Sequence, residues 1–442
     1  MYPQLNDLAV LHRQPEAGYY YMPHAEAATE RINRTGTEVL ELCDGAHSID
    51  DICRIMSVRH VETEERVRSL VFPFLVESVT RGTVTVSPVP TPNSEVEGVS
   101  RVTGSYDSWI PLLTSFELTS SCNLTCSHCY ASATLGNGIR PTTERIIETL
   151  TYMARRGTYS VLLTGGEPTM HPGFLKILHA AVSLMRLVRV ATNLYSIPET
   201  IMKELIADDR ITLQTSVDGV RSTHDLIRGG KNSFTRTIAN IERLAQAGKI
   251  VIVAMTANRL NFREVEEVVR RCVGAGAAAF RLGLTFPIGR AAQAGLSLTE
   301  EENAILREDW QRIVETYSSP TFSLNRSEEA DDFQEVALTG ADIGSCGAGH
   351  LIVHVSANGD VNPCPMLSLK LGNINNQPLD EVFSGPLYRI LEHASSPGSD
   401  RCAGCSLASL CGRCHAAAFA WGRTADCWWA DTPLANTLAV RG

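Results

Sequence analysis

The chain has 442 residues, of which 44% are hydrophobic and 20% charged, and its net charge is −10. This length predicts two to four domains, and the negative charge disfavours a general affinity for nucleic acid. No run of about 18 uncharged apolar residues occurs, and the N-terminus lacks the basic and apolar parts of a signal peptide, so we expect no membrane contact and a cytoplasmic location. There, the 13 cysteines are expected to bind metal where they are grouped, rather than to form disulfides.

Residues 1–86 are predicted to form a small separate domain. A hairpin is expected between residues 8 and 22. Ser48, with Asp51 three residues later, is typical of a helix N-cap. Helices are expected at 37–44, 49–57 and 62–80, and a strand at 83–86. This order of short strands, three helices and a wing-like strand predicts a winged-helix unit.

Residues 87–110 are predicted to be a linker. Pro88, Pro90 and Pro92, with small polar neighbours, disfavour regular structure there.

Residues 111–325 alternate between β-like and helical segments, which predicts parallel strands joined by crossover helices. Strands are expected at 115–119, 160–164, 187–192, 211–216, 251–256 and 279–284. Helices are expected at 142–156, 173–185, 198–207, 233–247 and 262–274. Six units are too few for a closed eight-unit barrel, so we predict an α/β fold with a partial (β/α)6 barrel of the TIM type. Its chemistry is expected at the C-terminal ends of the strands.

A further helix is expected to begin at Thr299, with Glu302 completing a T-x-x-E box, and to end near Tyr317. The acidic residues 327–334 are predicted to be a solvated loop. Residues 335–442 show little periodicity but contain seven cysteines, so we expect metal ligation to order them.

Three cysteines follow the first barrel strand in a C-x3-C-x2-C pattern, Cys122, Cys126 and Cys129. Three thiolates on one loop can bind three irons of a [4Fe–4S] cluster and leave the fourth iron open. A three-cysteine zinc site is the alternative. The pattern resembles the signature of the radical S-adenosylmethionine (SAM) superfamily, in which the methionine part of SAM chelates the open iron. The resemblance also implies that His128 lies near the adenine.

The second strand ends in Gly165, Gly166, Glu167 and Pro168, which resembles the GGEP motif of this superfamily. There the motif binds the SAM amino group. Glycines allow close backbone approach, and a carboxylate can accept a hydrogen bond from a charged amine. The alternative is an ordinary loop between a strand and a helix.

Polar residues at later strand ends are further candidates for SAM contacts. The stretch 224–229 resembles one found in the peptide-modifying branch of the superfamily, and the resemblance implies that Ser216 and Arg228 contact the methionine or ribose of SAM. Asn193 and Asn258 are weaker candidates. Loop residues without a ligand are the alternative, and Asp218 with Gly219 is interpreted as a turn.

The C-terminal cysteines resemble those of a SPASM domain, the cluster-bearing extension of many radical SAM peptide maturases. The resemblance implies two auxiliary iron–sulfur clusters. The proximal cluster is assigned to Cys346, Cys364 and Cys414, and the distal cluster to Cys402, Cys405, Cys411 and Cys427. A zinc ribbon between residues 402 and 414 is the alternative, but it leaves the other three cysteines unused.

Two departures from the SPASM pattern concern the proximal cluster. No cysteine lies between Cys346 and Cys364, so this cluster has three thiolates and an open iron, takes a non-cysteine ligand, or is smaller. Sulfatase-maturing relatives carry a carboxylate where this chain has Pro365, which disfavours their oxidation of serine or cysteine. The separation of Cys411 and Cys414 by two residues, rather than three, is a variant spacing.

Residues 33–49 resemble the PqqD-like recognition element that binds the leader of a ribosomal precursor peptide by strand addition. A DNA-binding winged helix is the alternative. Residues 1–86 contain eight arginines and no lysine against nine glutamates and four aspartates, a net charge of −5 that disfavours phosphate contacts. The remaining cysteines, Cys43, Cys53 and Cys272, lie in apolar helical patterns and are predicted to be buried structural thiols.

These resemblances together imply an enzyme that cleaves SAM reductively and oxidises a peptide, with a flavodoxin or a ferredoxin as electron donor. The expected product is a cross-link, either a thioether or a carbon–carbon or carbon–oxygen bond. Two alternatives remain, a radical SAM maturase of a small molecule such as a tetrapyrrole, and an iron–sulfur redox sensor with a winged-helix head. The acidic head disfavours the sensor.

Overall fold

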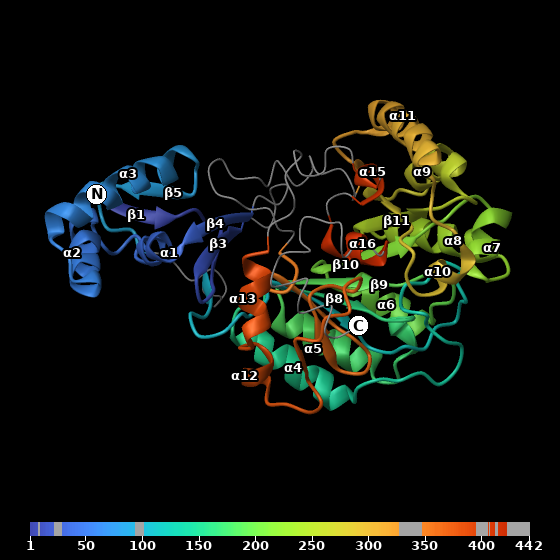
Figure 1. Ribbon diagram of the computed structural model, residues 1–442, viewed down its shortest axis with the longest axis horizontal. Coiled ribbons are helices and arrows are strands. Elements are labelled where there is room, and N and C mark those ends of the chain that lie inside the picture. The colour runs from blue at the N-terminus through green and yellow to red at the C-terminus, as the bar shows by residue number, and fades with distance from the viewer. Residues whose placement is uncertain are drawn as a thin grey trace. The chain divides into compact units, whose positions relative to one another are not determined.

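The computed structural model describes residues 1–7, 9–21, 29–92, 101–326, 347–394, 405, 407–411 and 414–421. These residues divide into two compact units, the first ending at Ile110 and the second beginning at Pro111 (Figure 1). Among the described residues, no helix is both long enough and apolar enough to span a membrane.

The first unit contains two small sheets and three helices. A four-stranded sheet has the order β4-β3-β2-β6, and β1 pairs with β5. The predicted hairpin is present as β2 and β3, and the predicted cap is confirmed, because Ser48 and Asp51 form a capping box. The elements are β1 (Tyr2–Leu5), β2 (Val10–Arg13), β3 (Ala17–Tyr21), β4 (Thr29–Asn33), α1 (Arg34–Glu41), α2 (Ile49–His60), α3 (Glu64–Thr80), β5 (Val84–Ser87) and β6 (Val102–Gly104).

Part of the segment predicted to be a linker belongs to the first unit. Strand β6 pairs in parallel with β2. Beyond it, the Ile110 carbonyl lies 2.7 Å from His12 Nε2 and accepts a hydrogen bond from Gln14 Nε2 at 3.2 Å. The prolines at 88–92 predict an irregular segment but say nothing about β6, because main-chain pairing requires no particular side chains. The first unit therefore reaches Ile110 instead of ending at residue 86.

The predicted burial of the three isolated cysteines is confirmed. Cys43 and Cys53 lie in the apolar core of the first unit, and Cys272 lies on the buried side of α9 (Val265–Gly274) in the second unit. All three side chains are inaccessible to solvent. They pack as small apolar groups, as expected of structural thiols.

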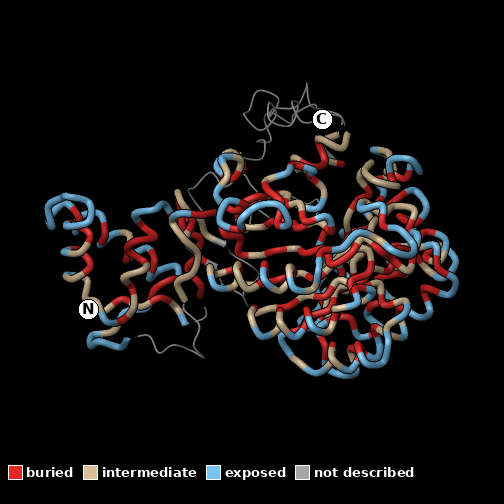
Figure 2. The backbone as a smooth tube through the Cα atoms, turned by 90° about the horizontal axis from the view of Figure 1, so that it is seen from below, coloured by how far each residue is buried: buried red, intermediate tan, exposed pale blue. Residues whose placement is uncertain are grey.

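The second unit contains a ten-stranded sheet with the order β13-β12-β11-β10-β9-β8-β7-β14-β15-β16. The strands from β7 to β13, and β14 beside β7, run parallel, and β15 and β16 are antiparallel. Much of the central sheet is buried (Figure 2). The strands are β7 (Leu113–Glu117), β8 (Ser160–Thr164), β9 (Leu187–Ala191), β10 (Ile211–Ser216), β11 (Val251–Ala257), β12 (Ala279–Leu284), β13 (Ser323–Arg326), β14 (Ile352–Val355), β15 (Asp360–Asn362) and β16 (Gly372–Asn373).

Helices follow the first strands in the alternation that the sequence predicts. They are α4 (Thr143–Arg155), η1 (Pro168–Met170), α5 (Phe174–Leu184), α6 (Glu199–Ala207), α7 (Ser222–Arg228), α8 (Ser233–Gln246), η2 (Phe262–Glu264), α9, α10 (Arg290–Ala294) and α11 (Glu300–Tyr317). Nearer the C-terminus are α12 (Leu379–Val382), α13 (Pro386–Glu392), α15 (Ala408–Cys411) and α16 (His415–Ala420).

All six predicted strands are present, and together with β13 they form a large parallel sheet. As described, the sheet has two edges, β13 and β16, so it is open, as the prediction of a partial barrel requires. The sequence did not reveal β13 to β16. Strand β14 lies beside β7, with His354 opposite Ser115, so the C-terminal segment extends the sheet in addition to carrying cysteines. These strands are only two to four residues long, too short for a periodic signal.

Candidate active site

The three cysteines of the C-x3-C-x2-C motif lie in the loop that follows β7. Ser127 N donates to Ile227 O at 2.8 Å, which attaches the loop to the last turn of α7. On the other side, Arg290 donates from Nε to Cys126 O at 2.7 Å and from NH1 to Ala133 O at 2.6 Å. The conformation of the motif thus depends on α7 and α10, which the sequence places far from it.

A cavity of about 360 Å³ lies at the C-terminal ends of the strands and is lined by all three cysteines. Its volume is typical of sites for small molecules. Six of the residues predicted to contact SAM also line it, namely His128, Gly165, Gly166, Asn193, Ser216 and Arg228. The sequence did not single out other residues that line the cavity, among them Tyr130, Gln214, Thr256, Phe286, Arg290 and Met366.

The three thiols can serve an iron–sulfur cluster, because each thiolate of a [4Fe–4S] cluster binds a different iron. Within the described parts of the chain, no group of three His, Cys, Asp or Glu side chains is placed to hold one metal ion. Burial raises the pKa of the Cys122 thiol to about 11, so its ionisation requires a cation beside it.

The two glycines of the GGEP motif pack against the loop that carries Cys122, Cys126 and Cys129 (the cluster loop), and both glycines also border the cavity. Gly165 has a φ of +142°, and a Cβ atom on Gly166 would lie 2.2 Å from Ser121 O. Gly166 N donates to Thr119 O at 2.7 Å. The end of β8 therefore lies directly against the start of the cluster loop, and a side chain at Gly166 would separate them.

Glu167 is fully buried and is not among the residues that line the cavity. Its carboxylate accepts hydrogen bonds from Thr169 Oγ1 at 2.6 Å and from Asn193 N at 2.8 Å. Burial raises the pKa of Glu167, although these hydrogen bonds oppose the shift. Pro168, which begins η1, is buried as well. Glu167 thus fixes the loop that carries Asn193, and its direct contact with SAM stays a prediction.

The two candidate asparagines differ in their surroundings. Asn193 lines the cavity, and its Nδ2 donates to Asn123 Oδ1 at 2.7 Å within the cluster loop. Asn258 is buried outside the cavity, where its Oδ1 accepts from Leu260 N at 2.9 Å and its Nδ2 donates to Thr256 O at 3.2 Å. The structure therefore brings Asn193 to the site, and Asn258 serves its own loop.

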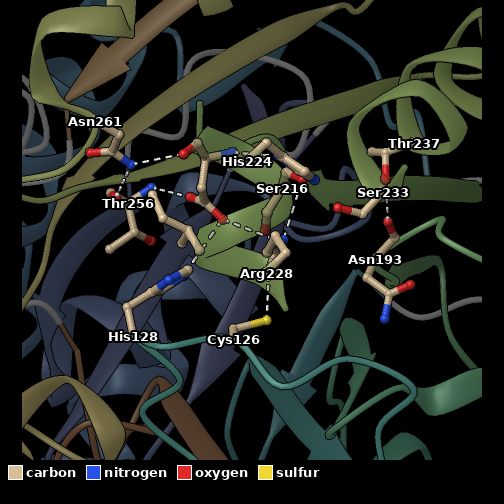
Figure 3. A network of polar contacts seen from close by, with 12 residues as sticks. Cys126, His128, Asn193, Ser216, His224, Arg228, Ser233, Thr237, Thr256 and Asn261 are labelled. Carbon is tan, nitrogen blue, oxygen red and sulfur yellow. Dashed lines mark hydrogen bonds and ion pairs between the residues drawn. The ribbon is translucent and has the colours of Figure 1, made fainter. Parts of the chain in front are cut away.

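Asp218 connects the cluster loop to two other parts of the site through His128, Arg228 and Thr256, which are labelled in Figure 3. Its side chain is inaccessible to solvent, and Oδ2 lies 2.9 Å from Arg228 Nε and 3.5 Å from His128 Nε2. Its Oδ1 accepts from Thr256 N at 2.8 Å. Arg228 in turn donates from NH1 to Cys126 Sγ at 3.4 Å. From the sequence, Asp218 was interpreted only as part of a turn, and its contacts with Arg228 and His128 were not predicted.

Asp218 and Arg228 each stabilise the charged form of the other. Burial opposes ionisation, yet the Arg228 guanidinium lowers the pKa of Asp218, and Asp218 raises the pKa of Arg228 against the same burial. Burial lowers the pKa of His128, and Asp218 opposes this shift only in part. The sequence carried no signal for Asp218, because the burial of Arg228, which calls for a carboxylate partner, is evident only in the fold.

The C-terminal cysteines are described only in part. Cys364, which follows β15, and Cys414, the N-cap residue of α16, line one small cavity of about 30 Å³. Cys364, Cys411 and Cys414 all pack against one cluster of apolar side chains, and Cys405 is exposed. The structure thus brings together two cysteines that the sequence assigns to the proximal cluster. The other predicted ligands, Cys346, Cys402 and Cys427, lie outside the described residues.

Comparison with known proteins agrees with this site. The radical SAM superfamily matches residues 116–272, and the iron–sulfur cluster-binding domain SPASM matches residues 346–406. The sporulation killing factor maturation protein SkfB of Bacillus subtilis is 32% identical over 307 residues, which cover 69% of this chain and 72% of SkfB. The antilisterial bacteriocin subtilosin biosynthesis protein AlbA of the same organism is 25% identical over 437 residues, 94% of this chain and 92% of AlbA.

Among solved structures, Streptococcus suis SuiB bound to its precursor peptide SuiA has the same fold. The TM-score is 0.64 at 16% identity, over 93% of this chain and 94% of SuiB. SAM and iron–sulfur clusters are the cofactors of the matched domains, and the three cysteines of the C-x3-C-x2-C motif line the cavity at the C-terminal ends of the parallel strands. The chain belongs to the radical SAM superfamily and carries a SPASM iron–sulfur cluster-binding domain.

Proposed function

We propose that this enzyme oxidatively modifies a ribosomally synthesised precursor peptide, whose leader it captures through the first unit. The cavity carries the proposal, because Pro365 and Met366 of the SPASM domain line it together with the cysteines of the cluster loop. A substrate held there would lie beside both iron–sulfur regions. SkfB and AlbA are named for the maturation and biosynthesis of peptide products, and SuiB was crystallised with a precursor peptide.

Different residues of the cavity would bind different parts of SAM. Cys122, Cys126 and Cys129 would hold a [4Fe–4S] cluster, which supplies the electron that cleaves SAM into methionine and a 5′-deoxyadenosyl radical. Arg228 offers a cation to the methionine carboxylate. His128 offers an aromatic surface to the adenine. The walls of the cavity would hold the reactants close together and exclude water, so that the radical is not quenched before it reaches the peptide.

Formation of a cross-link removes two hydrogens from the peptide. One leaves as a hydrogen atom to the deoxyadenosyl radical, and the other as a proton and an electron. We assign acceptance of this electron to the SPASM domain, which would hold two auxiliary clusters. The proposed proximal ligands are Cys346, Cys364 and Cys414, and the proposed distal ligands are Cys402, Cys405, Cys411 and Cys427. A flavodoxin or a ferredoxin would supply the reducing electron.

The proposed product is a thioether or a carbon–carbon or carbon–oxygen cross-link. Three thiolates at the proximal cluster would leave one iron without a protein thiolate. A cysteine thiolate of the peptide could bind there, which favours the thioether.

The first unit would act as a PqqD-like recognition element with a winged-helix arrangement of its strands and helices. Its four-stranded sheet has β4 and β6 at its edges. A leader that adds as a strand draws affinity from main-chain hydrogen bonds, and side-chain pockets then select the partner. The net charge of −5 over residues 1–86 favours a peptide over a nucleic acid as that partner.

The proposal is tested with the precursor peptide encoded beside the gene. The full-length enzyme, reduced and supplied with SAM, should convert the intact precursor to a product lighter by two hydrogens, detected by mass spectrometry. A leaderless core, or an enzyme lacking residues 1–110, should give far less product. A proline in the middle of the binding strand of the leader should weaken binding, because proline has no main-chain donor. Deoxyadenosine release stimulated by a tetrapyrrole and by no peptide would contradict the proposal.

A further inference from the structure

We infer that Asp218 is a positioning residue that holds the Arg228 guanidinium against Cys126 and thereby sets the reduction potential of the SAM-binding cluster. The inference requires only that Cys122, Cys126 and Cys129 hold this cluster. It does not depend on the identity of the substrate, so it can fail or hold separately from the proposed peptide modification.

Each nitrogen of the guanidinium lies beside one partner, and Figure 3 labels two of these, Cys126 and Ser216. Nε lies 2.9 Å from Asp218 Oδ2 in an ion pair without hydrogen-bond geometry, NH1 donates to Cys126 Sγ at 3.4 Å, and NH2 donates to Ser216 O at 3.3 Å. The guanidinium is planar and rigid, so fixing one edge fixes the direction of the others. Asp218 therefore determines where the N–H group that faces the sulfur points.

Asp218 is itself held firmly. Its Oδ1 accepts from Thr256 N on β11, and its main-chain oxygen accepts from Asn261 Nδ2 at 3.0 Å. Within the described residues, Asp218 is the only carboxylate that forms an ion pair with Arg228. The Arg228 side chain is only 11% exposed, and a buried guanidinium without a carboxylate is unstable. Without Asp218 we expect the guanidinium to turn away from Cys126.

A positively charged donor beside a cluster thiolate favours the reduced cluster. Reduction adds negative charge, and hydrogen bonds to the sulfurs and nearby charge are among the factors that set the potential of an iron–sulfur cluster. The direction in which the reduction potential changes when Asp218 is removed distinguishes two roles of this residue. As an isolated negative charge it would lower the potential, and its removal would raise it. As the anchor of Arg228, its removal should lower the potential.

The test is a redox titration of the reconstituted full-length protein without SAM, followed by electron paramagnetic resonance. The variants are Asp218→Asn, Arg228→Met, Arg228→Lys and the double variant Asp218→Asn with Arg228→Met. Asp225→Asn is the control, because Asp225 lies on the same helix as Arg228, α7, but accepts hydrogen bonds from Ser233 Oγ at 2.7 Å and Phe234 N at 2.9 Å instead of pairing with Arg228. Signals from auxiliary clusters are identified with a Cys122, Cys126 and Cys129→Ala protein.

We expect Asp218→Asn and Arg228→Met to lower the midpoint potential with iron content unchanged, Arg228→Lys to lower it less, and Asp225→Asn to leave it unchanged. The double variant should not fall below Arg228→Met, because Asp218 acts through Arg228. A potential that rises in Asp218→Asn, or that stays unchanged in Arg228→Met, would overturn the inference. If Asp218→Asn fails to assemble the cluster, the two Arg228 variants decide, because their carboxylate is retained. An Arg228 that contacts only SAM would change SAM affinity without changing the potential.

Discussion

His354 Nε2 lies 3.3 Å from Glu117 Oε1, between the neighbouring strands β14 and β7. The other ring nitrogen lies 3.2 Å from Ser115 Oγ, and Glu117 Oε2 accepts from Ala357 N at 3.1 Å. Both His354 and Glu117 are buried, and Ser115 lines the cavity. A polar network therefore joins the first strand of the radical SAM domain to the first strand of the SPASM segment.

Replacing His354 with phenylalanine should destabilise this junction. Glu117 would lose a buried partner, which costs about 1–3 kcal/mol of unfolding free energy. Thermal unfolding of the reconstituted protein measures the loss. His179→Phe is the control, because the His179 side chain is 60% exposed and should matter little. Equal effects of the two substitutions would show that the buried network contributes nothing specific.

Anaerobic reconstitution should give about 12 irons and about 12 sulfides per chain, four of each for each of three [4Fe–4S] clusters. Replacing Cys122, Cys126 and Cys129 together with alanine should leave about 8 irons and abolish SAM cleavage. Iron and sulfide analysis and deoxyadenosine release are the measurements. Stoichiometric zinc with little sulfide in the native protein would contradict this expectation.

Replacing Gly166 with alanine should reduce the iron bound at the SAM-binding site. The new Cβ would lie 2.2 Å from Ser121 O, so the start of the cluster loop would have to move. Gly274→Ala is the matched control, since no atom lies within 4 Å of the Cβ position there and the residue ends helix α9. Iron analysis should show a loss of up to about four irons, one cluster, in Gly166→Ala alone. Full iron content in that variant would mean that the loop adapts.

Replacing Glu167 with alanine should destabilise the protein as well as weaken SAM binding. The substitution leaves Asn193 N and Thr169 Oγ1 without their buried acceptor, at a cost of about 1–3 kcal/mol for each unsatisfied group. A direct ligand contact alone would predict weaker binding, by roughly 1.5–3 kcal/mol, with unchanged stability. Thermal unfolding without SAM, compared with calorimetric SAM binding, distinguishes the two roles.

The isolated fragment 1–110 should lose stability in mild acid because of His12. Burial lowers the pKa of His12 from 6.5 to about 4. The ring stays neutral in the folded state while the unfolded chain takes up a proton below about pH 6.5, so stability falls between pH 6.5 and pH 4. The loss is on the order of 3 kcal/mol. Urea unfolding should show this part of the pH dependence in the native fragment and not in His12→Gln, and parallel profiles would contradict it.

The sequence by itself determined those features whose cause is local. Three cysteines within eight residues predict a cluster-binding loop wherever that loop lies in the fold. The capping boxes of Ser48 with Asp51 and of Thr299 with Glu302 join residues only three positions apart, and both are present. The six strands from β7 to β12 and the helices α4, α5, α6, α8 and α9 could be located because hydrophobic periodicity acts over one element at a time, whereas the seven-residue helix α7 was not predicted.

The tertiary structure decided which distant residues meet. Strand β6 joins the first unit, and β14 extends the sheet beside β7, because main-chain groups at a strand edge pair with whatever segment the chain path brings there. The same holds for charge. Asp218 looks like a turn residue until the fold buries it against Arg228, and only burial in a low-dielectric site turns a common Asp-Gly pair into the ion-pair partner of an arginine that donates to Cys126.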